Sequence, residues 1–200
     1  APVEVPTEEP TEEPTEETVV VEEPTGLTCA EPIKVGLITD ITGALAIYGA
    51  MITRSFMLGM EYATGSEGSA GPVYNFAETQ ENTFKIDDCE IQVFVRDDAG
   101  LPENTTTVAN ELIDIHDVDI LVGTASSGAT AVLQGIALAN EVPLIVAPAA
   151  ANDITGKDFN EYTFRTARNN YQDAMNECIA LTQNYSSFIQ IAADYAFGYG

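Results

Sequence analysis

The chain has 200 residues, and 45% of them are hydrophobic, which is enough for a packed core in one or two domains. It carries 32 Asp and Glu against 7 Lys and Arg, for a formal net charge of −25 at pH 7. A field of this sign repels nucleic acids and anionic lipids, so it excludes a nucleic-acid-binding protein. The sequence has no run of about 18 apolar residues and therefore predicts no membrane-spanning helix.

Residues 1–28 predict a disordered acidic spacer. Residues 1–26 hold nine Glu and no basic residue, and a Pro-Thr-Glu-Glu repeat between Pro6 and Glu17 offers no side chain for a core. The other 23 acidic and 7 basic residues leave 27–200 with a net charge of −16. Because the numbering starts at Ala1 and not at Met, we expect that a leader was removed, and we hypothesise a lipidated Cys ahead of Ala1.

The segments that follow alternate between strand and helix patterns. A short β-branched apolar run is typical of a buried strand, and a longer segment with apolar positions on one face is typical of a helix. Pro102 marks a helix start, because the N–H that proline lacks has no partner in a first helical turn. The patterns predict a strand at 33–39, a helix at 44–63, a long surface connection at 64–88, a strand at 90–96 and a helix at 102–114.

The middle of the chain has the order of a buried strand, a tight turn and a helix. The strand stops at Gly123, and Ser126, Ser127 and Gly128 lead into an apolar helix that ends near Asn140. The free N–H groups and the positive dipole of such a helix start suit a carboxylate or phosphate. Serine is also an ordinary N-cap residue, so the stretch equally fits a capped helix that binds nothing.

The rest of the chain continues the alternation, with strands at 142–147, 162–166 and 187–193 and a helix at 169–184. This order predicts an α/β fold built on a doubly wound parallel sheet with right-handed crossovers. Ligands of such sheets bind beyond the carboxyl ends of the strands. The loops expected at that edge are residues 40–49, 97–101, 124–128 and 148–152.

Two of the three cysteines lie at the start of predicted strands. Cys29 precedes the first strand and Cys89 begins the second, so both lie at one end of the sheet if these strands are parallel neighbours. This placement fits a disulfide formed in an oxidising compartment, and it fits two separate buried thiols equally well. Cys178 falls within a predicted helix, where we expect a core residue.

Sequence signals for catalysis are weak. The chain contains neither the glycine-rich phosphate loop nor the dinucleotide-binding turn, and Ser126 does not stand in a nucleophile elbow. His116, the single histidine, lies away from the ligand loops and fits a packing or solvent-facing role. Asp97 and Asp98 have the chemistry for a hard metal but also fit a plain polar turn. We therefore predict no enzyme activity, no cofactor and no metal.

Five segments in the predicted ligand loops and strands carry short motifs in a consistent order. They are 33–43 with 47–49, 121–128 (Leu-Val-Gly-Thr-Ala-Ser-Ser-Gly), 142–151, 162–166 and 194–198. Together they resemble the type I periplasmic solute-binding proteins of the branched-chain amino acid (Leu/Ile/Val) family of ABC transporters. The resemblance extends over 33–200 and implies two α/β lobes that close on a small solute.

The resemblance also implies which residues contact the solute. Tyr48 would cover the apolar part of the solute, although it also fits packing along its helix. Ser126, Ser127 and Gly128 would hold the carboxylate through backbone N–H groups and the Ser127 hydroxyl, and Ala149 would lend a backbone group.

Four further positions complete the implied site. Ala151 would also lend a backbone group, and it stands where amino-acid binders of this family commonly carry a Thr or Ser hydroxyl. That departure favours a related acid or amide over a standard amino acid. Arg168, Tyr171 and Phe197 would contribute from the second lobe, and Arg168 equally fits a surface ion pair.

The resemblance implies that the spacer at 1–28 is followed by a complete lobe one at 29–166 and by the start of a truncated lobe two at 167–200. It implies an extracytoplasmic, lipid-anchored protein that delivers an amino-acid-like solute, carboxylate or amide to an ABC permease. A ligand-sensing domain of the same fold, in a receptor or an amide-responsive regulator, is the second hypothesis. A flavodoxin-like enzyme is the third, and the missing phosphate loop counts against it.

Overall fold

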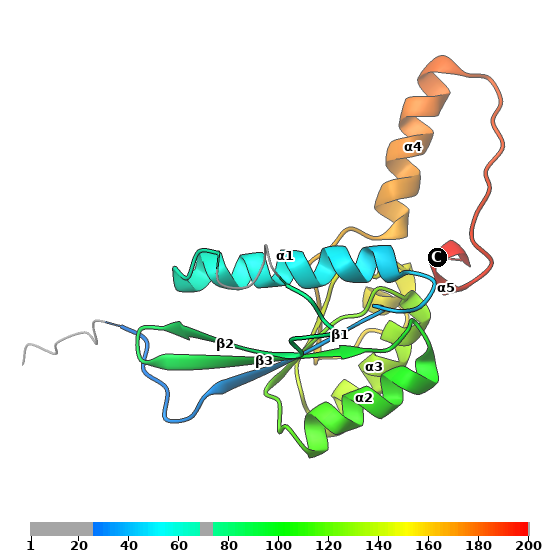
Figure 1. The fold of residues 1–200 in the computed structure, drawn as a ribbon. Helices are drawn as coiled ribbons and strands as arrows, with labels where there is room; N and C mark the ends of the chain where they lie inside the picture. The colour runs from blue at the N-terminus through cyan, green and yellow to red at the C-terminus, as the bar shows by residue number, and fades with distance from the viewer. Residues whose placement is uncertain (1–25, 69–73, 200) are drawn as a thin grey trace, which may run out of the picture.

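A six-stranded sheet forms the centre of the structure, a computed structural model that describes residues 26–68 and 74–199 (Figure 1). Its strand order is β2-β3-β1-β4-β5-β6. All neighbours are parallel except β2, which runs antiparallel to β3. The predicted α/β fold with a mainly parallel sheet is therefore confirmed, while the spacer predicted at 1–28 lies almost wholly outside the described residues. The strands are β1 (Ile33–Thr39), β2 (Glu81–Ile86), β3 (Cys89–Asp97), β4 (Ile120–Val122), β5 (Leu144–Val146) and β6 (Thr163–Arg165).

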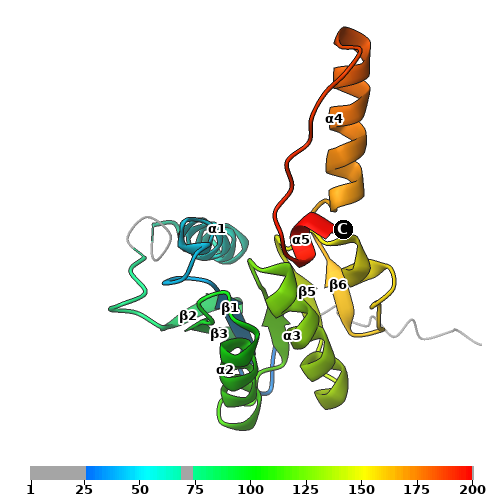
Figure 2. The same cartoon turned by 90° about the vertical axis from the view of Figure 1, so that its right-hand side faces the viewer.

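Helices cover both faces of the sheet (Figures 1 and 2). Helix α1 (Ala46–Thr64) lies on one face, and α2 (Pro102–Asp114) and α3 (Ser127–Asn140) lie side by side on the other. Side chains alternate between faces along a strand, so neighbouring residues of β1 enter different cores. Leu37 packs in the cluster under α1, and Ile38 packs in the cluster under α2 and α3. The helix predictions are confirmed to within two residues at each end.

Strand β2 was not predicted, because the surface connection expected at 64–88 contains it. Its sequence, Glu-Asn-Thr-Phe-Lys-Ile, is mostly polar and includes a single fully buried position, Phe84. This edge strand contributes one fully buried side chain to the core and leaves the others half-buried or exposed, so its hydrophobic signal is weak. Only its pairing with the buried strand β3 decides that it is a strand.

The C-terminal segment differs from prediction. Helix α4 (Asn170–Asn184) projects away from the sheet, and residues 187–193 return beside it without strand structure before the short α5 (Ala196–Tyr199) (Figure 1). The strand predicted at 187–193 is therefore wrong for this structure: a strand needs a neighbour for its backbone hydrogen bonds, and none lies beside it among the described residues. The core position expected for Cys178 is also wrong, since its thiol is exposed on α4.

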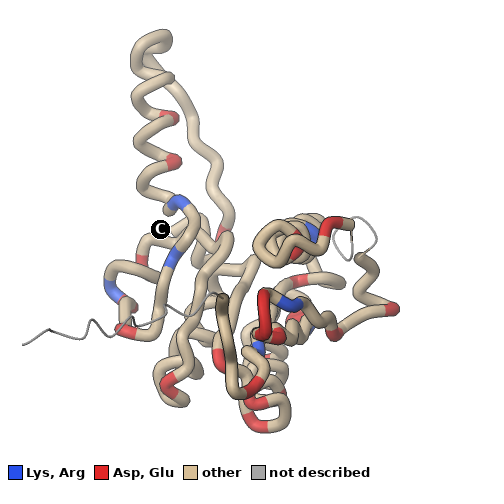
Figure 3. The backbone as a smooth tube through the Cα atoms, turned by 90° about the vertical axis from the view of Figure 1, so that its left-hand side faces the viewer, with Lys and Arg blue, Asp and Glu red and all other residues tan. Residues whose placement is uncertain are grey.

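Acidic residues are spread over the helices and loops, and basic residues are few (Figure 3). Among the described residues, no group of three or more His, Cys, Asp and Glu side chains is arranged to hold a metal ion. In the same part of the chain, no helix is both long and apolar enough to cross a membrane.

A disulfide joins Cys29 to Cys89 with a Cα–Cα distance of 4.9 Å. Register explains the pairing, because Ile33 of β1 lies opposite Ile91 of β3 and the two cysteines come just before these residues at the same end of the sheet. The bond closes a loop that contains α1 and β2, with 60 residues of sequence separation. Between the two arrangements that the sequence left open, the structure has the disulfide.

We predict that Cys29→Ser/Cys89→Ser lowers the free energy of unfolding by about 2–4 kcal/mol, because the disulfide restricts the unfolded chain. Denaturant unfolding of the native protein at its natural length measures the change. Cys178→Ser removes an exposed thiol and serves as the matched control, with no expected loss. An equal unfolding midpoint for the double variant and the wild type would contradict the prediction.

Candidate functional site

Two carboxylates, one within the loop between β1 and α1 and one at the end of β3, accept hydrogen bonds from the backbone of this loop. Asp40 is fully buried and accepts a hydrogen bond from the Gly43 N–H at 2.6 Å. Asp97, at the end of β3, accepts one from the Ile41 N–H at 2.8 Å. Gly49 is required in the first turn of α1, since a Cβ there would overlap the Asp40 carbonyl. These acidic side chains therefore stabilise the turn that positions α1.

Asp97 and Asp98 have opposite pKa shifts. Burial acts to raise the pKa of Asp97, but hydrogen bonds from the Thr42 hydroxyl at 2.5 Å and from three backbone N–H groups outweigh it and lower the pKa. For Asp98 burial dominates and raises the pKa, although one backbone N–H and the Thr105 hydroxyl donate to the carboxylate. Both carboxylates thus accept hydrogen bonds from backbone and hydroxyl groups of the turn and its neighbours.

The start of α3 lies at the same edge of the sheet. The Ser126 hydroxyl caps the helix by accepting from the Ala129 N–H at 3.4 Å. The N–H groups of Ser127 and Gly128 have no hydrogen-bond partner within the described part of the chain. Gly123 ends β4 with φ +148°, where a Cβ would overlap a β1 carbonyl, so the turn into the helix requires glycine. Two free donors at the positive end of the helix dipole can receive an anion.

The loop after β5, residues 148–152, is bonded along its length to other elements. Its Ala151 N–H donates to the Ser127 hydroxyl oxygen at 3.2 Å, and its Ala151 carbonyl accepts from the Arg165 guanidinium at 2.6 Å. The Ala150 carbonyl accepts from the Asn170 N–H at 2.8 Å. The Ala151 N–H is therefore already used within the protein, and only its carbonyl could accept a second hydrogen bond from a solute.

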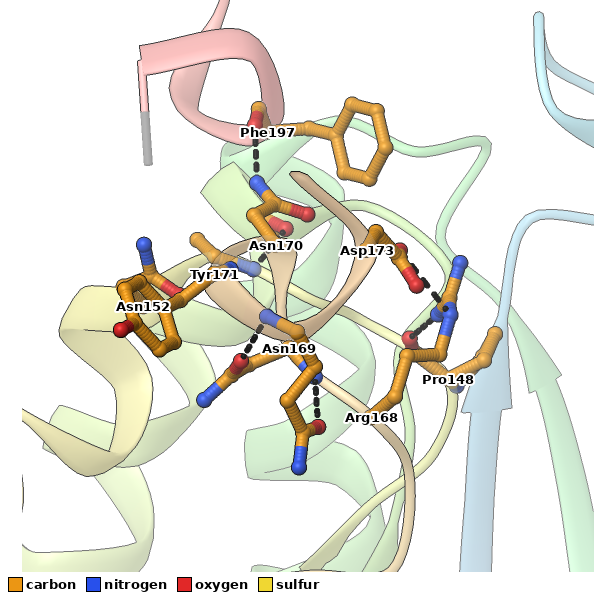
Figure 4. A network of polar contacts seen from close by, with 11 residues as sticks. Pro148, Asn152, Arg168, Asn169, Asn170, Tyr171, Asp173 and Phe197 are labelled. Atoms are coloured by element: carbon orange, nitrogen blue, oxygen red, sulfur yellow. Dashed lines mark hydrogen bonds and ion pairs between the residues drawn. The ribbon is translucent and has the colours of Figure 1, made fainter. Parts of the chain in front are cut away.

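Figure 4 shows how the segment before α4 reaches this loop. The Arg168 guanidinium donates to the Pro148 carbonyl at 3.2 Å, and Asn152 accepts from the Tyr171 N–H at 2.9 Å. The side chain of Asn170 donates to the Phe197 carbonyl, which ties α5 to the start of α4. The loop, the first turn of α4 and α5 thus form one hydrogen-bonded unit.

A cavity of about 570 Å³ opens between these elements. One wall is α1, another is formed by β4 and the 148–152 loop, and the third comes from Arg168 and α5. Most of the wall is apolar or aromatic, and Arg168 is the single charged side chain in it within the described residues. The lining residues are Leu45, Tyr48, Met51, Ile52, Ser55, Phe56, Val122, Ala125, Ala147, Pro148, Ala149, Ala150, Arg168, Tyr195 and Phe197.

Four of the residues predicted from the sequence meet in this wall, namely Tyr48, Ala149, Arg168 and Phe197. The other five do not line it. Ser126, Ser127 and Ala151 are buried, Gly128 is half-buried and the Tyr171 side chain is exposed.

Helical spacing contained a signal that the sequence analysis missed. Met51, Ile52, Ser55 and Phe56 follow Tyr48 at intervals of three and four residues, so they share its face of α1 and line the cavity with it. Tyr195 was also missed, although it lies in the same motif as Phe197, and the two rings stack with centroids 6.0 Å apart.

Residues 32–200 match the family model described as Periplasmic binding protein. Among solved structures, an ABC-type branched-chain amino acid transporter protein from Rhodopseudomonas palustris CGA009 has 32% identity and a TM-score of 0.64, over 84% of this chain and 41% of that chain. A solute-binding protein of an ABC transporter from Rhodopseudomonas palustris BisB5, in complex with 3,4-dihydroxybenzoic acid, has 26% identity and a TM-score of 0.68 over the same shares, 84% and 41%.

A third similar structure is the branched-chain amino acid transporter substrate-binding protein LivJ from Streptococcus pneumoniae in complex with isoleucine. It has 25% identity and a TM-score of 0.55, over 70% of this chain and 34% of that chain. The chain thus spans about two fifths or less of the length of these structures. No curated protein sequence matches it.

The lowered pKa of Asp97 predicts a pH dependence of stability. Its ionised form stabilises the folded state above the unfolded pKa of about 4, and this contribution is lost as the pH falls through the lower folded pKa. Asp97→Asn should be less stable by about 1 kcal/mol at pH 7 and should lose less stability than wild type between pH 5 and pH 3. The raised pKa of Asp98 changes stability with pH in the opposite direction. Because Asp98 is present in both proteins, the difference in stability between variant and wild type reports on Asp97. Parallel stability curves for the two proteins, from urea unfolding at each pH, would exclude this role.

Proposed function

The chain belongs to the periplasmic binding protein family, and from this premise we propose that it is the solute-binding component of an ABC importer. It binds a small molecule outside the cytoplasm and presents it to a permease, without chemical change. Residues 29–166 form lobe one and residues from 167 onward begin lobe two. The N-terminal acidic segment is a spacer that connects lobe one to a lipid anchor.

The composition of the cavity wall carries the proposal for the solute. Aromatic rings of Tyr48, Phe56, Tyr195 and Phe197 surround an apolar volume, and Arg168 provides one positive charge at its edge. Apolar walls with a few placed polar groups are typical of small-molecule sites. The solute that fits is a monocarboxylate with an aromatic or branched apolar body.

Two groups of donors support a carboxylate end. The guanidinium of Arg168 borders the cavity, and the free N–H groups of Ser127 and Gly128 lie two and three residues beyond the lining residue Ala125. Charge-assisted bonds from such donors favour an anion. The two relatives with ligands agree with this chemistry, since dihydroxybenzoic acid and isoleucine share a carboxyl group and an apolar body.

The chain favours an aromatic acid over a standard amino acid. Ala151 offers no hydroxyl to an amino group, and its N–H and carbonyl already form hydrogen bonds. Aromatic side chains, in contrast, come from two separate elements and face the same volume. Stacked and edge-to-face contacts between rings stabilise an aromatic solute beyond its buried area.

Lobe closure gives the mechanism. Helix α4 has no buried residue, and Met175 and Ile179 are exposed on it, so the helix presents apolar surface for the rest of lobe two. Closure of lobe two over the 148–152 loop would exclude water from the cavity and strengthen each polar contact with the solute.

We predict that benzoate and 4-hydroxybenzoate stabilise the native protein at its natural length more than leucine does, and that benzamide stabilises it least. Stabilisation follows RT ln(1 + [L]/Kd), so a solute at 100 times its Kd adds about 2.7 kcal/mol. A thermal-shift screen followed by calorimetry ranks the compounds. If no carboxylate shifts the unfolding temperature, the proposed function is wrong. If amides bind as tightly as acids, the carboxylate assignment is wrong.

We predict that Tyr48→Ala weakens benzoate binding by about tenfold, because an aromatic contact and its buried area are lost. Tyr62→Ala is the matched control: it removes the same side chain from the same helix, at a position that is 89% exposed and outside the cavity. Calorimetric titration of both variants measures the effect. Equal affinity in the two variants would place the solute elsewhere.

A further inference from the structure

Arg168 is held by two contacts on different atoms. Its Nε lies 3.2 Å from Oδ2 of Asp173, and its Nη1 donates to the Pro148 carbonyl at 3.2 Å. Its Nη2 has no partner among the described residues. One guanidinium group thus spans from the cavity loop to α4 and keeps free N–H groups (Figure 4).

Asp173 lies in a helical turn that several hydrogen bonds hold in place. It lies in the first turn of α4, which begins with a capping box in which Asn169 accepts from the Gln172 N–H at 3.0 Å and donates to its side chain at 2.9 Å. An acidic side chain in a first turn is also stabilised by the helix dipole. Since Asn170 bonds the same turn to the Ala150 carbonyl, the backbone of Asp173 is fixed relative to the cavity wall.

We propose that Asp173 is a positioning residue for carboxylate recognition: it orients Arg168 so that the free end of the guanidinium meets the carboxylate of the solute. This inference rests on the proposed function and adds a residue that neither contacts the cavity nor was expected from the sequence. Without Asp173 the long Arg168 side chain, which is 49% exposed, keeps only its bond to the Pro148 carbonyl, and the loss of rotamer freedom on binding a solute opposes binding more strongly.

The fold does not depend on this contact. Arg168 and Asp173 are both substantially exposed, at 49% and 39% of their side-chain area, and ion pairs of this kind contribute little to stability. Removal of the Asp173 charge therefore leaves a folded protein whose solute affinity can be compared directly with that of the wild type.

The test measures Kd by calorimetry for benzoate and leucine, each beside its amide, benzamide or leucinamide, in the native protein at its natural length. Asp173→Asn should weaken binding of the carboxylates by about three- to tenfold, while the amides change by less than about twofold. Asp173→Glu, which keeps the charge, should recover part of the affinity. In an Arg168→Ala background, Asp173→Asn should have no further effect.

Glu177→Gln is the matched control, because Glu177 lies one turn along α4 and forms no ion pair within the described residues. It removes the same charge and should leave each Kd unchanged. Tighter carboxylate binding by Asp173→Asn would mean that Asp173 competes with the solute. Equal loss of affinity for acids and amides would mean a merely structural role. Either result would overturn this inference and leave the proposed function standing. If the wild type binds neither carboxylate, the proposed function fails and the inference fails with it.

Discussion

The candidate site depends on how the loop at 148–152 satisfies its backbone groups. A loop that lies against a core cannot leave its N–H and carbonyl groups unpaired, because each would lose its hydrogen bonds to water. Here Ser127 accepts from the Ala151 N–H, and three carbonyls of the loop accept from Arg165, Arg168 and Asn170. The loop is therefore shaped by the start of α3 on one side and by the crossing into α4 on the other.

This arrangement links the cavity to the element that moves in the proposed mechanism. The same segment that bonds the loop also contains Arg168, which borders the cavity, and continues directly into α4. A continuous set of hydrogen bonds therefore connects a solute in contact with the loop to the first turn of α4. The acidic turns around Asp40 and Asp97 have a different part, since they place α1 and its aromatic face opposite this loop.

Prediction from the sequence succeeded where a residue pattern is local. Buried strands and amphipathic helices have periodic apolar positions. The helix that begins at Pro102 and the turn that begins at Gly123 have residues that few other conformations accept. Prediction failed where the structure depends on a neighbour. Strand β2 exists because β3 is beside it, and residues 187–193 have strand-forming side chains without a strand to pair with in the described structure.

Residue patterns alone predicted the α/β class and the edge of the sheet where the loops gather, because these follow from periodicity and from the fixed direction of parallel strands. The four predicted residues that line the cavity came instead from the resemblance of short motifs to a known family. Three contacts are known only from the folded protein: the Cys29–Cys89 disulfide, the bond from the Ala151 N–H to the Ser127 hydroxyl, and the ion pair of Asp173 with Arg168. Such contacts join residues far apart in the chain or on different turns. Their geometry arises from packing, which no local pattern of residues encodes.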